Sequence, residues 1–259
     1  MAALPRIDRR CRNPAGPPAP ARPDYTGEHV VTKFCTLTER TQLTFADTVI
    51  KPYLANLGVY LHPPVLVAHA KKKGKVHRGG GRKYLPMKND ILRFLAQENG
   101  GNVFFTTMID LYAISAEFPG LAEADKLRHI PDKRVEALEQ AFARDIGDGR
   151  FVPYIQLHEY EAYLFSDPTW FGYFYDHHER QIAALKAIAD THATPELIDD
   201  GQHSAPSKRI IAELPDYEDA KSAVGPQVAE LIGLQVIRSK CPHFAAWLAQ
   251  LEKLGGETL

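Results

Sequence analysis

The chain has 259 residues, of which 44% are hydrophobic and 24% are charged, and its formal net charge is −1. This composition suits one large globular domain or a domain with an appendage, and it excludes a general electrostatic attraction to nucleic acid or membranes. No segment approaches the roughly 20 apolar residues that cross a bilayer. Its cysteines are few and far apart, which excludes a disulfide framework and favours a reducing compartment, so we expect a cytoplasmic protein.

The first 28 residues are rich in proline and arginine and contain no apolar stretch of the kind found in a signal peptide. Such a segment buries too little apolar surface to offset the entropy lost on folding, so we predict a disordered leader over residues 1–28. An α/β domain is expected over 29–167, followed by a helical C-terminal subdomain over 168–259 that packs on it.

Apolar segments alternate with helical patterns through the expected α/β domain, and Pro52 predicts a kink or break in the first helix. The alternation predicts an α/β fold with a mostly parallel, doubly wound sheet. The expected strands lie near 31–37, 59–69, 103–109 and 151–157, with helices near 44–57, 86–98 and 131–145. The C-terminal part has helical patterns near 169–175, 179–191, 207–214, 227–232 and 244–253.

A basic, glycine-rich segment follows the second expected strand. Its glycines would let the backbone approach a phosphate chain closely while the cations contact it, although a solvated charged surface explains the same pattern. Two more cations follow Ser207 at an expected helix start, where they would bind phosphate or serve only as surface charges near a cap. The candidate nucleic-acid-binding residues are Lys71, Lys72, Lys73, Lys75, Arg78, Arg82, Lys83, Lys208 and Arg209.

An almost unbroken apolar run ends at Asp110. Such a run is typical of a central strand covered on both faces. An aspartate at a strand end is often a cap for the following turn. No helix start follows Asp110 for many residues, which weakens the capping interpretation.

A second strand-to-helix junction brings three ionisable residues together. The strand pattern stops at Leu157, and good helix formers follow from Glu159 to Phe165. His158, Glu159 and Glu161 therefore crowd the junction, and ligand sites in open α/β sheets form beyond the carboxyl ends of the strands. In the alternative interpretation, His158 caps the helix and the glutamates favour the positive end of its dipole.

Two neighbouring strands would bring these residues to one edge of the sheet. Asp110, Glu159 and Glu161 would then form an oxygen-rich set that suits Mg²⁺ or Mn²⁺. His158 would act as an acid or base, or would hold a phosphate. The pattern predicts a metal-dependent phosphodiesterase that acts on nucleic acid, whereas carboxylates that point apart into helix caps would contradict this function.

Several motifs together resemble the bacterial family catalogued as domain of unknown function 4276, from about residue 43 to residue 251. The resemblance implies a Toprim-like fold, which is the fold of a metal-binding nuclease and topoisomerase domain. It also implies an ATPase partner and a role in phage defence. The motifs are Thr106 to Tyr112, Phe118 to Gly120, Tyr154 to Ala162, Ala205 to Arg209 and Cys241 to Trp247.

The chain departs from the family pattern at its start. The first strand of the family usually ends in Glu-Gly-x-Thr-Glu, and matching Thr44-Phe45 to the following helix places Thr38 and Gln42 at the two glutamates. Because both acids are missing, the resemblance implies either a weakened nuclease or a catalytically degenerate subunit that docks the ATPase. The sequence leaves the nucleic acid, the partner and the oligomeric state open.

Overall fold

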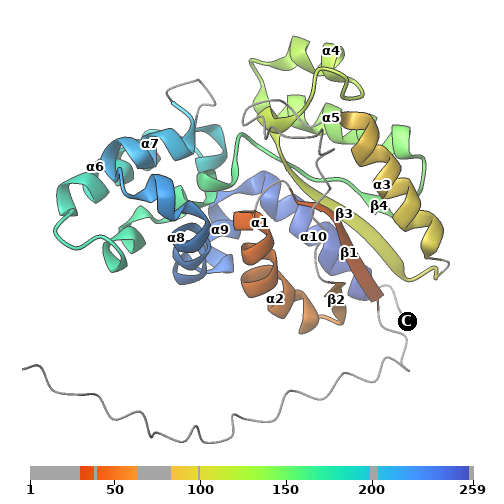
Figure 1. The fold of residues 1–259 in the computed structure, drawn as a ribbon, viewed down its shortest axis with the longest axis horizontal. Coiled ribbons are helices and arrows are strands. Elements are labelled where there is room, and N and C mark those ends of the chain that lie inside the picture. The colour runs from red at the N-terminus through yellow and green to blue at the C-terminus, as the bar shows by residue number, and fades with distance from the viewer. Residues whose placement is uncertain (1–29, 38–39, 63–82, 99, 199–203, 257–259) are drawn as a thin grey trace, which may run out of the picture.

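The computed structural model describes residues 30–37, 40–62, 83–98, 100–198 and 204–256 (Figure 1). The expected leader, residues 63–69 of the expected strand 59–69, and the motif position Thr38 lie outside the described residues. The same holds for Lys71, Lys72, Lys73, Lys75, Arg78 and Arg82.

The sheet contains β1 (Val30–Leu37), β2 (Val59–His62), β3 (Val103–Asp110), β4 (Phe151–Val152) and β5 (Ile155–Gln156). The strand order is β2-β1-β3-β4, with β5 paired to the end of β3, and every pairing is parallel. These pairings confirm a mixed α/β fold with a parallel sheet. The expected strand 151–157 is split around Pro153, because proline has no N–H to donate to a strand ladder.

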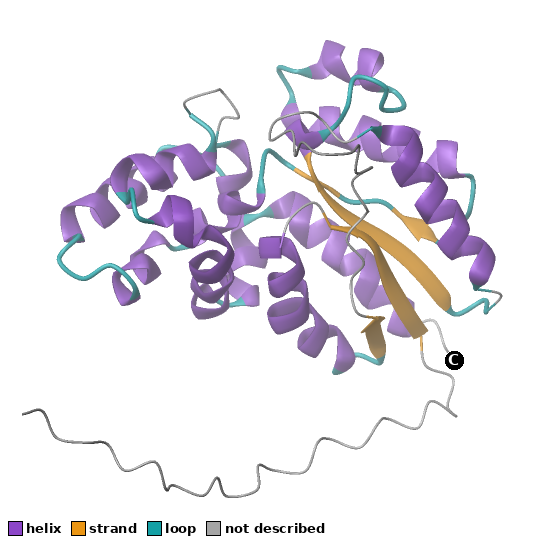
Figure 2. Cartoon of the chain, viewed as in Figure 1, coloured by secondary structure: helices purple, strands orange, loops and turns teal. Residues whose placement is uncertain are grey.

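Helices α3 (Tyr84–Gln97) and α5 (Pro131–Ile146) cover one face of the sheet (Figures 1 and 2). Both have apolar residues at helical spacing, and their buried stripes meet the side chains of β3. Ile91 of α3 and Leu138 of α5 lie in one cluster with Phe105 and Ile109 of β3. Burial of this face accounts for every second residue of the apolar run in β3, and the helices on the opposite face account for the others.

The opposite face is covered by α1 (Arg40–Phe45), the π-helical turn η1 (Ala46–Ile50), α2 (Lys51–Ala55) and α10 (Pro242–Gly256). The expected break at Pro52 takes the form of this π-helical turn, which ends just before α2. Trp247 of α10 donates an indole N–H to Thr106 Oγ1 at 2.9 Å and stacks on Tyr154, with ring centroids 4.5 Å apart. Helix α10 therefore belongs to the hydrophobic core on this face of the sheet.

Helices and 3₁₀ turns make up most of the remaining described chain: η2 (Leu111–Ala113), α4 (Leu121–Ala124), η3 (Asp125–Leu127), η4 (Tyr160–Ser166), η5 (Pro168–Tyr173), α6 (Glu179–Asp190), η6 (Pro195–Leu197), α7 (Pro206–Glu213), α8 (Tyr217–Ile232) and α9 (Leu234–Lys240). The segment expected as a helix over 159–165 is the 3₁₀ helix η4, and α8 continues through Pro226 although proline usually interrupts a helix.

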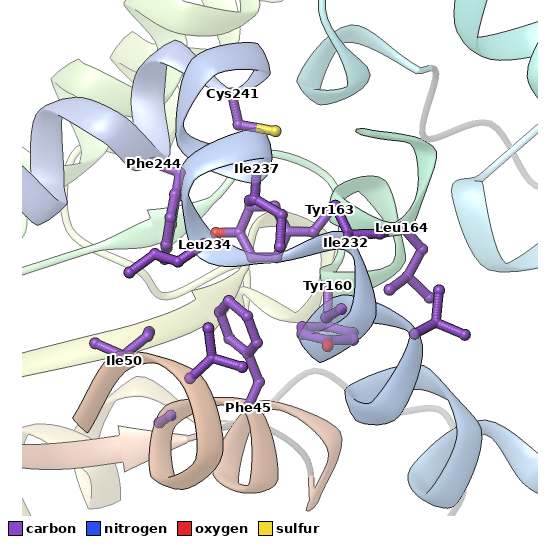
Figure 3. Packing of buried hydrophobic residues seen from close by; sticks show 14 of the residues in the cluster. Phe45, Ile50, Tyr160, Tyr163, Leu164, Ile232, Leu234, Ile237, Cys241 and Phe244 are labelled. Carbon is purple, nitrogen blue, oxygen red and sulfur yellow. The ribbon is translucent and has the colours of Figure 1, made fainter. Parts of the chain in front are cut away.

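Aromatic packing joins these helices to the sheet. Phe45 of α1 lies against Tyr160 and Tyr163 of η4, with ring centroids 5.5 and 5.6 Å apart. Tyr163 in turn lies 4.8 Å from Phe244 of α10. Figure 3 shows these rings converging with Ile237 of α9. No helix within the described part of the chain is long and apolar enough to span a bilayer.

A buried polar cluster fixes the start of α10. Glu196 of η6 accepts the backbone N–H groups of His243 and Phe244, each at 2.9 Å. His243 Nε2 lies 3.0 Å from Glu139 Oε1 of α5 and 3.1 Å from the carbonyl oxygen of Ile155. Glu139 Oε1 also accepts the N–H of Ile155 at 2.8 Å. Side chains of two helices thus satisfy both backbone groups of this residue in β5.

Candidate functional site

The carboxyl ends of β1 and β3 lie side by side at the point where the strand order reverses. Strand β2 lies beyond β1, and β4 lies beyond β3, so the following connections leave in opposite directions. Such a reversal opens a crevice where α/β proteins place their ligand sites. Helix α1 begins shortly after β1, and Asp110 is the last residue of β3.

Gln42 of α1 and Asp110 connect these two strand ends. Gln42 Nε2 donates a hydrogen bond to Asp110 Oδ1 over 2.7 Å, and both side chains are buried, with exposed fractions of 0% and 6%. A buried carboxylate needs donors to replace its lost hydration, and the primary amide supplies one. The pair ties the helix after β1 to the end of β3.

Glu159 makes a different contact, at the start of α7. It lies just before η4 in extended backbone and is buried. One carboxylate oxygen accepts the backbone N–H of Ser207, and the other accepts the Ser207 hydroxyl at 3.1 Å. Glu159 therefore caps a helix 48 residues away in the chain. This contact agrees with the alternative interpretation of the sequence, in which the glutamates lie at the positive end of a helix dipole. The helix is α7, however, and not the one that follows Glu159.

Glu161 belongs to η4 and is also buried. Its Oε1 lies 3.7 Å from Lys221 Nζ of α8, and the lysine side chain is 30% exposed. This ion pair connects η4 to a third helix. The three candidate carboxylates thus reach into α1, α7 and α8 respectively.

His158 occupies a strained backbone conformation at the same edge. Its φ of 63° lies in the left-handed region, which a non-glycine residue adopts at a cost of about 1–3 kcal/mol. Its side chain is buried. The cap position of η4 belongs to Glu159 and not to His158. His158 lies between β5 and η4, and the two glutamates that follow it contact different partners.

Tyr217 and Gly225 of α8 pack where this helix meets α1 and η4. Tyr217 is fully buried, and burial, followed by the charge of Glu161, raises its pKa well above the usual value. Tyr160 donates to the carbonyl oxygen of Gly225 at 3.4 Å, and burial raises the pKa of Tyr160 as well. A Cβ on Gly225 would lie 2.9 Å from the Tyr217 hydroxyl and 3.2 Å from Thr41 Cγ2, so glycine permits α8 to approach α1.

A family model described as Domain of unknown function (DUF4276) matches residues 39–252 of the chain. The chain belongs to this family. The match confirms the resemblance drawn from the motifs, and it extends from the first residues of the site to the last turns of α10. Comparisons of this DUF4276 chain with curated proteins and with solved structures gave no match.

The sequence led us to expect a divalent metal ion at this site. Asp110, Glu159 and Glu161 offer the hard oxygen ligands that Mg²⁺ prefers. Each of them, however, is engaged by a different protein donor. Among the residues that the structure describes, no group of three His, Cys, Asp or Glu side chains is arranged to hold a metal ion. The present arrangement does not fit the ion, and binding would require these donors to be released.

The described candidates for nucleic-acid binding fall in two places. Lys83 is exposed just before α3, and Lys208 is exposed in the first turn of α7. Arg209 is half-buried, and its Nε donates to the carbonyl oxygen of Ser204 at 2.7 Å. Lys208 and Arg209 directly follow Ser207, so they lie beside the acidic edge of the sheet. A shared basic surface with the lysines of 71–82 stays a prediction.

Sequence reasoning missed Lys221 and Tyr217, and it noted Gln42 only as a departure from a motif. Gly225 and Pro226 precede the helix expected over 227–232, and only the structure places them inside α8. The close contact at Gly225 therefore had no local signal in the sequence.

Proposed function

We propose that this chain is a catalytically degenerate member of a Toprim-like, doubly wound fold, and that it serves as an interaction subunit. The observation that carries the proposal is the hydrogen bond between Gln42 and Asp110. In the family pattern, Gln42 stands where a second glutamate is expected. An amide at this position supplies a donor to Asp110, whereas a glutamate would supply another ligand for a cation.

The contacts of the other two carboxylates support the same conclusion. Glu159 is held by Ser207 of α7, and Glu161 is paired with Lys221 of α8. Buried carboxylates with protein donors contribute to the fold without a metal ion, because the donors replace water. These contacts fix α1, α7 and α8 to one edge of the sheet. A rigid arrangement suits a docking subunit, because it presents a preformed surface to its partner.

The expected partner is an ATPase in a phage-defence system, as the family resemblance implies. Co-expression of the chain with an ATPase from the same locus tests this role. The two proteins should elute together in size-exclusion chromatography. Separate elution, together with metal-dependent cleavage by the chain alone, would contradict the interaction role.

The nuclease assay separates the two functions directly. The purified chain is incubated with single- and double-stranded DNA and RNA in the presence of Mg²⁺ or Mn²⁺, beside the Asp110→Asn variant. We expect the wild type to cleave no faster than this variant. A rate that depends on the metal and is lost in Asp110→Asn would instead establish an active site.

A metal-dependent phosphodiesterase, or nuclease, remains the second candidate. The observation that favours it is the meeting of Asp110, His158, Glu159 and Glu161 at the ends of the paired strands β3 and β5, with backbone strain at His158. In that function the three carboxylates, once released from Gln42, Ser207 and Lys221, would hold Mg²⁺ or Mn²⁺. His158 would transfer a proton or hold a phosphate, and the basic residues would contact nucleic acid. The bound ion would supply charge neutralisation at the phosphate.

A further inference from the structure

Two large aromatic side chains of the 3₁₀ helix η5 are exposed to solvent. Trp170 is 39% exposed and Tyr173 is 73% exposed. A 3₁₀ helix has three residues per turn, so side chains that are three positions apart lie on the same face. Trp170 and Tyr173, here called the aromatic pair, therefore share one face of η5, while Pro168 and Phe171 share a buried face.

The backbone that carries the aromatic pair is held firmly in place. Phe171 packs edge-on against Tyr217 of α8, with ring centroids 5.6 Å apart. Asp167 caps the start of η5, because its side chain accepts the backbone N–H of Thr169 at 3.2 Å. Exposed tryptophan and tyrosine side chains on a rigid backbone are typical of the residues that dominate binding surfaces, since each buries a large area at a small cost in entropy.

The chain around the aromatic pair is acidic. Residues 167–180 contain three acidic residues and one arginine, namely Asp167, Asp176, Glu179 and Arg180. Asp176 and Glu179 are exposed. Nucleic-acid bases stack on aromatic side chains, but these carboxylates would repel the phosphates that accompany the bases. The charge therefore favours a cationic partner for the aromatic pair.

The chain itself contains a segment of matching chemistry. Residues 9–23, which lie outside the described part of the structure, contain four arginines and no acidic residue. A polyproline helix has three residues per turn, so prolines at every third position share one of its sides. Such segments bind aromatic surfaces with little loss of entropy, because their conformation is already restricted. Prolines occur at this spacing at Pro14, Pro17, Pro20 and Pro23.

We propose that residues 9–23 of one copy dock on the aromatic pair of a second copy, with prolines on the rings and arginines beside Asp176 and Glu179. Pro23 precedes β1 by only seven residues and reaches at most about 25 Å from it. Figure 1 shows β1 and α6, the helix that follows η5, at opposite sides of the molecule, which favours a second copy. This self-association goes beyond the interaction role and does not depend on Asp110 or on an ATPase.

Fluorescence anisotropy of a labelled peptide of residues 9–23, titrated with the full chain, tests the surface. Trp170→Ala and Tyr173→Ala should each weaken peptide binding at least about tenfold. Leu85→Ala removes an exposed leucine of α3 and is the matched control. A peptide with alanine in place of the four prolines should bind more weakly. Asp176→Asn combined with Glu179→Gln should make binding less sensitive to salt.

Sedimentation velocity of the full chain at increasing concentration tests the second copy. The wild type should self-associate, excess peptide should dissociate it, and Trp170→Ala should stay monomeric while its circular dichroism is unchanged. Equal peptide binding by Trp170→Ala and Leu85→Ala would overturn the proposal. So would a wild type that stays monomeric at concentrations that bind the peptide. Binding of single-stranded oligonucleotide that is lost in Trp170→Ala, without binding of the peptide, would replace it with nucleic-acid recognition.

Discussion

Gln42 donates a 2.7 Å hydrogen bond to Asp110 across the carboxyl ends of two parallel strands, 68 residues apart in the chain. This contact joins the helix after β1 to the last residue of β3. It lies at the point where the strand order reverses. An amide at position 42 stabilises the Asp110 carboxylate without a cation, whereas a carboxylate there would favour one. A single substitution at Gln42 tests this difference.

Gln42→Glu should destabilise the fold at neutral pH by about 1–3 kcal/mol, because it replaces a donor with a second buried carboxylate. Two close carboxylates favour sharing a proton, so the pair has a raised pKa, and the lost stability should return as the pH falls. Mg²⁺ should raise the melting temperature of this variant more than that of the wild type. Thermal unfolding with and without Mg²⁺ at pH 5 and pH 7.5 measures both effects. The double variant Gln42→Glu, Asp110→Asn is the control, and it should show neither.

Gly225→Ala should lower stability by about 1–3 kcal/mol, because the new Cβ would lie 2.9 Å from the Tyr217 hydroxyl in a packed core. Helix propensity alone predicts the opposite sign, since alanine is better than glycine in a helix by about 1 kcal/mol. Urea unfolding measures the difference. Adding Tyr217→Phe should recover part of the loss. Gly101→Ala, where a Cβ meets nothing within 4 Å, is the matched control.

Trp247→Ala should destabilise the chain by about 3–5 kcal/mol, because it removes a buried aromatic residue from between α10 and the sheet. Thr106→Val removes the acceptor of the indole N–H and also the hydrogen bond that the Thr106 hydroxyl donates to the carbonyl oxygen of Val152, and it should cost about 1–3 kcal/mol. Chemical denaturation distinguishes the two values. Trp170→Ala changes an exposed tryptophan of η5, and a cost as large as that of Trp247→Ala would refute the assignment of α10 to the core.

Stability should fall as the pH rises above the ordinary pKa of histidine. Burial alone would lower the pKa of His243, but the hydrogen bond and charge of Glu139 outweigh it, and the net pKa is raised. A raised folded-state pKa adds stability that is fully present below the unfolded value of about 6.5 and is lost as the pH rises through the folded value. Burial raises the pKa of Glu196, which acts in the same direction at lower pH.

Urea unfolding of the wild type and of His243→Gln between pH 6 and pH 9 measures this dependence. The variant should have a flatter profile over this range. His129→Gln, which changes an exposed histidine, should keep the wild-type slope. A wild-type slope in His243→Gln would show that another group carries the pH dependence.

The sequence by itself determined the strands, the main helices and the family. The apolar run before Asp110 predicted a central strand, and β3 occupies residues 103–110 with helices on both faces. Helix α5 begins at Pro131, as its apolar spacing predicted. These features follow from local periodicity, because burial on a helix face or in a strand leaves a regular pattern in neighbouring residues.

Only the tertiary structure decided what the acidic residues do. The sequence correctly placed Asp110 and the glutamates near one edge of the sheet, but Glu159 binds Ser207 and Glu161 approaches Lys221. Helix α8, which carries Lys221, runs on through Pro226 and begins at Tyr217, well before its expected start. Partners 48 to 68 residues away leave no periodic signal in the chain. Whether a carboxylate holds a metal, caps a helix or pairs with a lysine depends on distances that are set only when those segments pack together.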